Sequence, residues 1–200
     1  MKQKIMLILG LFIVNTSVFA STHILFLGDS LSEGIGLDEE QSFPRLVEKK
    51  LKAKKYDVVV TNGGVSGSTS ASGLTRLKWH LKKPTDVLVL ELGANDGLRG
   101  LKLEETKKNL TAIIKMAKDK KVKVLLLGLL MPPNYGKKYT AEFEAMYKNI
   151  AKNEKVALHP FILKDVAGRA EYNLPDGVHP NAKGQELVAT TVTEFMEKNL

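Results

Sequence analysis

This sequence contains residue types that could form a nucleophilic catalytic site. They are a serine near the start of the chain and a closely spaced Asp–His pair near its end. Ser30 follows an apolar run, and a serine at a strand-to-helix turn is exposed to substrate and favoured as a nucleophile by the helix dipole. Asp176 and His179 are three residues apart, a spacing that brings side chains together on one helical turn. The carboxylate would orient the imidazole toward Ser30, so these residues predict nucleophilic acyl transfer.

The tetrahedral intermediate of acyl transfer also needs hydrogen-bond donors for its oxyanion. Asn95 can donate its side-chain amide N–H, while Gly67 and Ser30 can present backbone N–H groups with little steric hindrance. The order Ser, Asp, His also occurs in α/β-hydrolases, but the segment 28–32, Gly-Asp-Ser-Leu-Ser, lacks the second glycine of their nucleophile elbow. The sequence therefore offers a nucleophile, a base, an orienting carboxylate and oxyanion donors, without the nucleophile elbow of the α/β-hydrolases.

Five short apolar runs are the predicted strands that position these residues. They begin about 30 residues apart and are almost wholly apolar, as in parallel strands buried on both faces and linked by helices. The runs cover residues 24–27, 58–60, 87–92, 122–130 and 156–158. Apolar residues at helical spacing lie between these runs. We expect the helix that contains the apolar stripe of residues 143–151 to begin with Thr140 as its N-cap. The pattern predicts a three-layer α/β/α sandwich around a five-stranded parallel sheet.

Four polar segments lie where a site would form in such a fold. They are residues 28–32, 62–67 and 93–96, each after a predicted strand, and residues 176–179, which precede the last helix. Ligand sites in parallel α/β sheets lie beyond the carboxyl ends of the strands. We therefore expect all four segments to converge on one rim.

These blocks, in this order, resemble the SGNH hydrolases of the GDSL superfamily, particularly the bacterial thioesterase I/lysophospholipase/arylesterase branch. The resemblance spans nearly the whole chain after residue 20 and rests on the segments 24–31, 62–67, 91–100 and 176–180. It implies the flavodoxin-like SGNH-hydrolase fold. It also implies Ser30, Asp176 and His179 as the triad, with Ser30, Gly67 and Asn95 as oxyanion donors. The N-x-x-x-S-G form of the second block selects Gly67 over the two earlier glycines, and Ala94 stands where the family often has glycine.

The resemblance further implies where the acyl group binds. Leu98, Pro132 and Tyr135 lie in segments that resemble the loops bordering the acyl-binding groove, so we expect them to contact substrate. The implied activity is that of an esterase or thioesterase of the arylesterase, lysophospholipase or acyl-CoA thioesterase type, with no cofactor and no metal ion.

Three alternatives remain at this point. A carbohydrate O-acetylesterase would share the fold and the triad. A non-catalytic, secreted, flavodoxin-like binding module would use the same rim, although the sequence lacks both the P-loop and the G-x-G-x-x-G pattern. His159 is a rival base at the end of the fifth predicted strand, but no carboxylate lies at a spacing comparable to that of Asp176.

The amino-acid composition and net charge exclude several classes of protein and of binding partner. The chain has 200 residues, no cysteine and 44% hydrophobic residues, which excludes collagen-like, disordered and disulfide-stapled proteins. Its formal charge of +8 comes mainly from scattered lysines without interleaved aromatic residues, so we expect no nucleic-acid partner. We expect a monomer that acts on a small acyl ester or thioester, with transient contact with lipid substrates.

The first 20 residues have the pattern of a signal peptide. Lys2 and Lys4 precede an apolar run over residues 5–14, and Ala20 ends a segment with small residues where signal peptidase cleaves. The run is too short to span a bilayer, although a retained anchor is the alternative. We predict cleavage after Ala20, no transmembrane segment in the mature chain, and a single SGNH-hydrolase domain over residues 21–200 in the periplasm or the medium.

Overall fold

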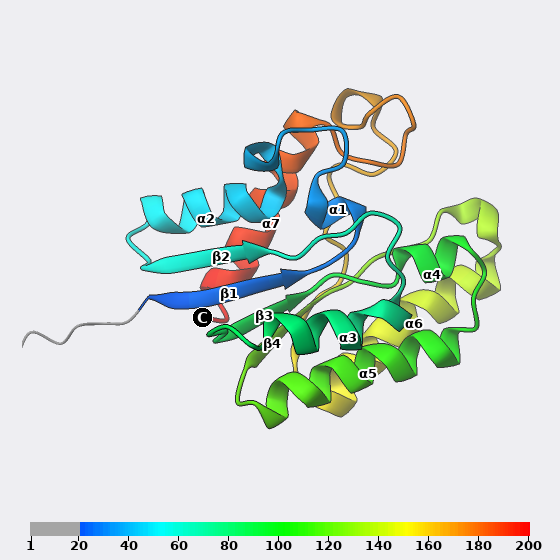
Figure 1. Cartoon of the computed structure of the whole chain (residues 1–200). Helices are drawn as coiled ribbons and strands as arrows, with labels where there is room; N and C mark the ends of the chain where they lie inside the picture. Colours follow the sequence, from blue (N-terminus) through cyan, green and yellow to red (C-terminus); the bar gives the residue numbers. More distant parts are fainter. Residues whose placement is uncertain (1–20) are drawn as a thin grey trace, which may run out of the picture.

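A parallel sheet between two layers of helices forms the centre of the molecule (Figure 1). The structure is a computed structural model and describes residues 21–200, so the predicted signal peptide lies outside the described residues. The strand order is β2-β1-β3-β4-β5. The strands are β1 (Thr22–Leu27), β2 (Val58–Asn62), β3 (Val87–Leu90), β4 (Lys123–Leu127) and β5 (Ala157–His159). The predicted three-layer fold with five parallel strands is confirmed.

Helices cover both faces of the sheet, as right-handed crossovers require. The helices are α1 (Ser30–Glu33), α2 (Phe43–Ala53), α3 (Ser70–His80), α4 (Ala94–Leu98), α5 (Leu103–Asp119), α6 (Lys137–Glu154) and α7 (Ala182–Glu197). In Figure 1, α2 and α7 lie on one side of the sheet, and α3, α5 and α6 lie on the other. The short helices α1 and α4 stand at the carboxyl ends of the strands, where the predicted site should form.

The burial pattern differs between the central strands and the edge strands of the sheet. All four residues of β3 are buried, whereas the edge strand β2 alternates, with Val58 and Val60 buried and Val59 exposed. Edge strands are exposed on part of their surface, so they tolerate this alternation better than central strands.

Two strands end before their apolar runs end. The last pair between β1 and β3 joins Leu27 to Leu90, so β3 loses its partner there although the run continues to Leu92. Likewise β4 ends at Leu127, and the apolar residues after it enter a loop. These residues leave the sheet at the rim where the polar segments lie.

The start of α6 differs from the prediction. The helix begins at Lys137 after Gly136, whose φ of 89° lies in the left-handed region that favours glycine. Thr140 lies inside the first turn, and its hydroxyl donates to the Lys137 carbonyl oxygen over 3.1 Å. The prediction of Thr140 as N-cap is therefore wrong, because the turn at Gly136 places the N-cap four residues earlier.

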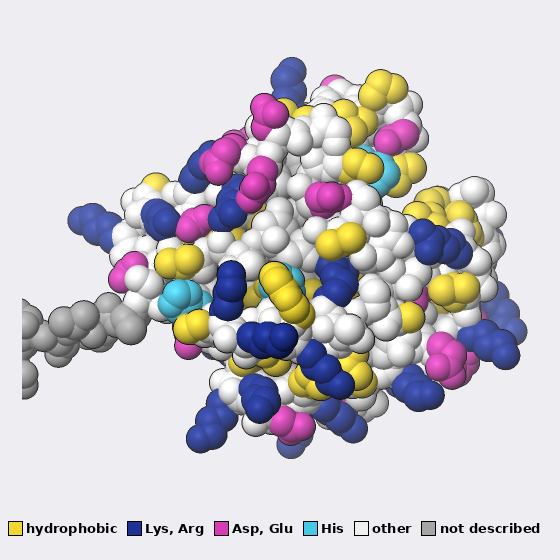
Figure 2. All heavy atoms as spheres, in the orientation of Figure 1, with side chains coloured by type: hydrophobic (Ala, Val, Ile, Leu, Met, Phe, Trp, Pro, Cys, Tyr) yellow, Lys and Arg dark blue, Asp and Glu magenta, His cyan; other side chains and the backbone are white. Residues whose placement is uncertain are grey.

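Charged side chains are spread over the surface. On the face shown in Figure 2, Lys and Arg side chains lie over several elements and are interspersed with Asp and Glu. Within residues 21–200, no helix combines the length and apolar character needed to cross a bilayer.

Candidate active site

Ser30, His179 and Asp176 form one continuous chain of hydrogen bonds. Ser30 is the first residue of α1, three residues after β1 ends at Leu27, and its Oγ lies 2.9 Å from His179 Nε2. His179 Nδ1 lies 2.8 Å from Asp176 Oδ2. The fold thus joins a serine and a histidine that are 149 residues apart, in the arrangement of nucleophile, base and orienting carboxylate.

A turn that is not helical holds the Asp–His pair. Asp176 Oδ1 accepts hydrogen bonds from the backbone N–H groups of Val178 and His179, over 2.8 and 3.0 Å. The predicted contact between Asp176 and His179 is present, but its attribution to a helical turn is wrong, because α7 begins only at Ala182. The hydrogen bonds from the His179 N–H, the His179 ring and Val178 lower the pKa of Asp176 to about 2. The carboxylate therefore stays ionised beside the imidazole.

Asn95 is held by the residue that precedes Ser30. Asp29 is the N-cap of α1, and its Oδ1 accepts from the Leu31 N–H over 3.0 Å. Its Oδ2 accepts from Asn95 Nδ2 over 3.1 Å. Burial raises the pKa of Asp29 to about 6. Since an amide nitrogen carries two hydrogens, Asn95 keeps one donor for the cleft that it lines.

The other two predicted oxyanion donors lie on the same rim. Ser30 is the first helical residue, so its N–H has no acceptor within the helix. Gly67 lies in the loop between β2 and α3 with a φ of 73°, a conformation that favours glycine. Arg99 Nη2 donates to the Gly67 carbonyl oxygen over 3.0 Å, which ties this loop to the end of α4.

His159 is placed differently. It is the last residue of β5, and its ring packs against Phe195 of α7 with a centroid distance of 5.5 Å. Ser30 Oγ forms its hydrogen bond with His179 instead. The geometry therefore favours His179 over its rival.

A cleft of about 560 Å³ opens over Ser30, His179 and Asn95. Leu98 and Pro132, two of the three residues predicted to contact substrate, line it. Most of the remaining wall is apolar and comes from the segments after β4 and β5; it includes Leu129, Leu130, Met131, Pro133, Phe161, Leu163, Ala167 and Val178. The site thus combines a polar floor with walls suited to an apolar chain.

Comparison with known proteins places the chain in a family. The model described as the GDSL-like lipase/acylhydrolase family matches residues 26–187. The chain belongs to this family. It is therefore a hydrolase, as the sequence predicted.

Relatives of this GDSL-family hydrolase include well-covered bacterial enzymes. An arylesterase of Vibrio mimicus is 38% identical over 190 residues, which cover 94% of this chain and 95% of the relative. The thioesterase 1/protease 1/lysophospholipase L1 of Escherichia coli strain K12 is 38% identical over 183 residues, which cover 90% of this chain and 84% of the relative. A crystal structure of TesA has a TM-score of 0.87 and 39% identity, with coverage of 90% of this chain and 100% of that chain. The predicted branch is confirmed.

Tyr135 lies outside the lining of the cleft in this GDSL-family hydrolase. Its hydroxyl donates to the Leu98 carbonyl oxygen over 3.0 Å, and its ring stacks on Tyr139 at 6.4 Å. It therefore contacts the backbone of a wall residue, and its role in substrate binding stays a prediction.

Some of the cleft-wall residues that were not predicted could have been recognised from the length of an apolar run. Leu129 and Leu130 belong to the apolar run 122–130, which is longer than a five-residue strand needs. Such an excess at the carboxyl end of a strand points to an apolar surface beside the site. Phe161 and Leu163 follow β5 with no comparable signal.

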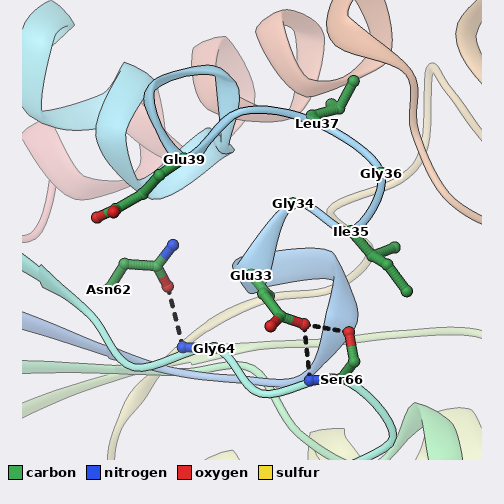
Figure 3. A pocket seen from close by; sticks show the side chains of 9 residues that line it. All are labelled: Glu33, Gly34, Ile35, Gly36, Leu37, Glu39, Asn62, Gly64 and Ser66. Atoms are coloured by element: carbon green, nitrogen blue, oxygen red, sulfur yellow. Dashed lines mark hydrogen bonds between the residues drawn. The ribbon is translucent and has the colours of Figure 1, made fainter.

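A second hollow of about 490 Å³ lies beside α1 and shares no lining residue with the cleft (Figure 3). Asn62 Oδ1 accepts from the Gly64 N–H over 2.9 Å, and Glu33 Oε2 accepts from the N–H and hydroxyl of Ser66. These bonds brace the loop that leads to Gly67. Within the described part of the chain, no three His, Cys, Asp or Glu side chains are grouped to hold a metal ion.

Proposed function

We propose that this hydrolase cleaves carboxylic esters or thioesters of acyl groups through a covalent acyl-enzyme on Ser30. The observation that carries the proposal is the hydrogen-bond chain from Ser30 through His179 to Asp176, which opens into an apolar cleft. The names of the relatives, an arylesterase and a thioesterase/lysophospholipase, support esters and thioesters as substrates.

In the acylation step, Ser30 Oγ attacks the carbonyl carbon while His179 Nε2 takes the hydroxyl proton. The new bond joins Ser30 to the acyl group, and the carbonyl electrons move onto the oxygen. When the tetrahedral intermediate collapses, the bond to the alcohol or thiol breaks and His179 returns the proton to the leaving group. Ionised Asp176 stabilises the imidazolium that exists between these two transfers.

Deacylation repeats the sequence with water as the nucleophile. His179 takes a proton from the water, the ester bond to Ser30 breaks, and the proton returns to Ser30. In both steps the negative oxygen would be bound by the Asn95 amide and by the N–H groups of Ser30 and Gly67. The residues of this chain supply every proton transfer, so the proposed reaction uses no cofactor.

The walls of the cleft favour the acyl chain as the group bound inside it. Leu98, Leu163 and Val178 offer apolar surface, and each methylene buried against such surface contributes about 0.8 kcal/mol. An acetylated sugar has little apolar surface to bury there. We therefore place acyl esters of medium length ahead of carbohydrate acetates, with lipid substrates reached by transient contact.

Labelling with a fluorophosphonate tests the mechanism directly. Wild type should form a covalent adduct on Ser30, located by peptide mass spectrometry, and Ser30→Ala should form none while remaining folded. Ser21→Ala is the matched control, because Ser21 lies before β1 at the opposite end of the sheet and should label like wild type. Labelling of Ser30→Ala at the wild-type rate, or no labelling of wild type, would sink the assignment.

A substrate panel then tests the class. Purified protein should hydrolyse p-nitrophenyl acyl esters, acyl-CoAs or lysophospholipids better than acetylated sugars. The reverse order would favour the carbohydrate O-acetylesterase.

We also propose export of the protein to the periplasm or medium, with cleavage after Ala20. The support is the pattern of residues 1–20 in the sequence. Amino-terminal sequencing of the mature protein should begin at Ser21, and a retained Met1 would contradict the proposal.

A further inference from the structure

A fully buried carboxyl group that the proposed reaction does not use lies beneath the nucleophile. Glu91 follows β3 directly, is 0% exposed, and its N–H donates to the Leu27 carbonyl oxygen over 2.9 Å. Burying a carboxyl group is costly unless its hydrogen-bonding capacity is satisfied. Among residues 21–200, Glu91 Oε1 has no hydrogen-bond partner, so an apolar residue would suit stability better at this position.

The other oxygen of Glu91 holds the turn that carries Ser30. Oε2 accepts from the Ser32 hydroxyl over 2.7 Å and lies 3.3 Å from the donating Asp29 N–H. These two donors stand one residue before and two residues after Ser30. One carboxyl oxygen therefore fixes the backbone on both sides of the nucleophile.

Glu91 also reaches the predicted oxyanion donor through a second link. Asp29, whose backbone Glu91 holds, accepts the amide of Asn95 with its own side chain. The positions of Ser30 Oγ and the Asn95 amide thus both depend on the Glu91 carboxyl group. The two groups must be placed around the same substrate carbonyl, because the oxyanion forms on the carbonyl that Ser30 attacks.

The neighbouring Gly28 shows how closely this group is packed. A Cβ on Gly28 would collide with Ser32 Oγ and lie 2.6 Å from Glu91 Oε2. Glycine at this position is therefore required by the approach of the Glu91 carboxyl and the Ser32 hydroxyl.

We propose that Glu91 is a positioning residue, which clamps the turn from Asp29 to Ser32 so that Ser30 and Asn95 act on one substrate carbonyl. This inference rests on the proposed function of Ser30. It assigns Glu91 no contact with substrate.

The ionisable groups around Glu91 indicate the protonation state of its carboxyl group. The ionisable groups that face it are Asp29 on the nucleophile turn, Arg76 on α3 and Tyr147 on α6. Burial, together with the charge of Asp29, raises the pKa of Glu91 well above its usual range. A neutral carboxyl group keeps Oε2 as an acceptor without placing a second negative charge beside Asp29. Glutamine, which is neutral and has a carbonyl acceptor, should therefore replace Glu91 far better than leucine does.

The experiment compares wild type with Glu91→Gln and Glu91→Leu. Measurements are kcat and KM on the best p-nitrophenyl ester, the rate of fluorophosphonate labelling, and thermal unfolding. We expect Glu91→Leu to lower kcat and the labelling rate by about 10- to 100-fold with KM within about twofold, because small misplacements of reacting groups cost rates of this order. Glu91→Gln should keep at least about a third of the wild-type kcat.

Val192→Ala is the matched control for instability, since Val192 is a buried residue on α7 outside the cleft. It should lower the unfolding temperature and leave kcat unchanged. Wild-type kcat in Glu91→Leu, or equal losses in the glutamine and leucine variants, would overturn the proposal.

Ser32→Ala keeps the test decisive if Glu91→Leu does not fold. It removes one of the two donors to Glu91 Oε2, and it should lower kcat several-fold at unchanged KM. An unchanged kcat in Ser32→Ala would then overturn the proposal. Labelling of Ser30 in wild type is measured alongside, so a failure of the proposed function is recognised separately.

Discussion

The side chain of Asn95 donates to Asp29, the residue immediately before Ser30, over 3.1 Å. The predicted oxyanion donor is therefore fixed to the cap of the same helix that begins with the predicted nucleophile. A donor held in place before the reaction needs no reorganisation when charge develops on the carbonyl oxygen. The bond uses one amide hydrogen and leaves the other for the cleft.

Asn95→Ala should mainly affect the transition state. Loss of one oxyanion donor typically costs about 10²–10³ in kcat, or roughly 2.7–4 kcal/mol, so we expect a fall of this order with little change in KM. Asn199→Ala is the control, because Asn199 donates to the Phe195 carbonyl oxygen at the end of α7, outside the cleft, and should keep kcat within about twofold of wild type. Steady-state kinetics check both. A near-normal kcat in Asn95→Ala would leave the role to the N–H groups of Ser30 and Gly67.

His179 is the proposed base, since its Nε2 lies 2.9 Å from Ser30 Oγ and its ring can accept the proton of that hydroxyl. The pKa of Asp176 is about 2, so at neutral pH its carboxylate is ionised and orients the ring. His179→Ala should lower kcat by more than about 10³, whereas His159→Ala should stay within a few-fold of wild type. Steady-state kinetics of the two variants test this. The opposite order of damage would make His159 the base.

Much of the fold could be predicted because buried parallel strands are apolar throughout. The runs at 24–27 and 87–92 have few polar interruptions, and consecutive apolar runs start about 30 residues apart, which leaves room for a crossover helix between them. The ends of elements were harder to predict. The end of β3 at Leu90 depends on where its partner β1 stops, and the start of α6 depends on the turn at Gly136. Both are set by contacts or backbone angles that a run of residue types does not display.

The candidate catalytic residues could be predicted from their types and order. The residues that hold them in place by hydrogen bonds could not. A serine after a strand and an Asp–His pair have a recognisable chemistry, and the fold brings them together. Glu91 shows only as a polar residue between apolar ones in sequence, and its bonds to Asp29 and Ser32 depend on the packing of β3 beside β1. Likewise, Asp29 holds Asn95 across 66 positions, a pairing without local signal.

Asp29 should make the stability of the protein depend on pH. Burial raises its pKa from 3.8 to about 6, so the folded state binds this proton more tightly than the unfolded state does. The resulting stabilisation is fully present below about pH 4 and is lost as the pH rises through about 6. From pH 4 to 7, the free energy of unfolding of wild type should therefore fall relative to that of Asp29→Asn, as measured by urea denaturation. Asp57→Asn, at an exposed site, should follow wild type, and parallel curves for all three proteins would contradict the prediction.

The apolar wall should set a preference for longer acyl chains. Each methylene buried in the cleft contributes about 0.8 kcal/mol, which corresponds to roughly a fourfold gain in kcat/KM until the cleft is filled. A series of p-nitrophenyl esters from acetyl to dodecanoyl should therefore show a maximum at medium length. Leu163→Ala removes part of the wall and should flatten the rise. Leu187→Ala serves as the control, because Leu187 lies on α7 outside the lining of the cleft, and the length profile should not change. If acetyl esters were the best substrates and Leu163→Ala left the profile unchanged, the acyl chain would not bind against this wall, and a preference for acetylated sugars would then identify a carbohydrate esterase.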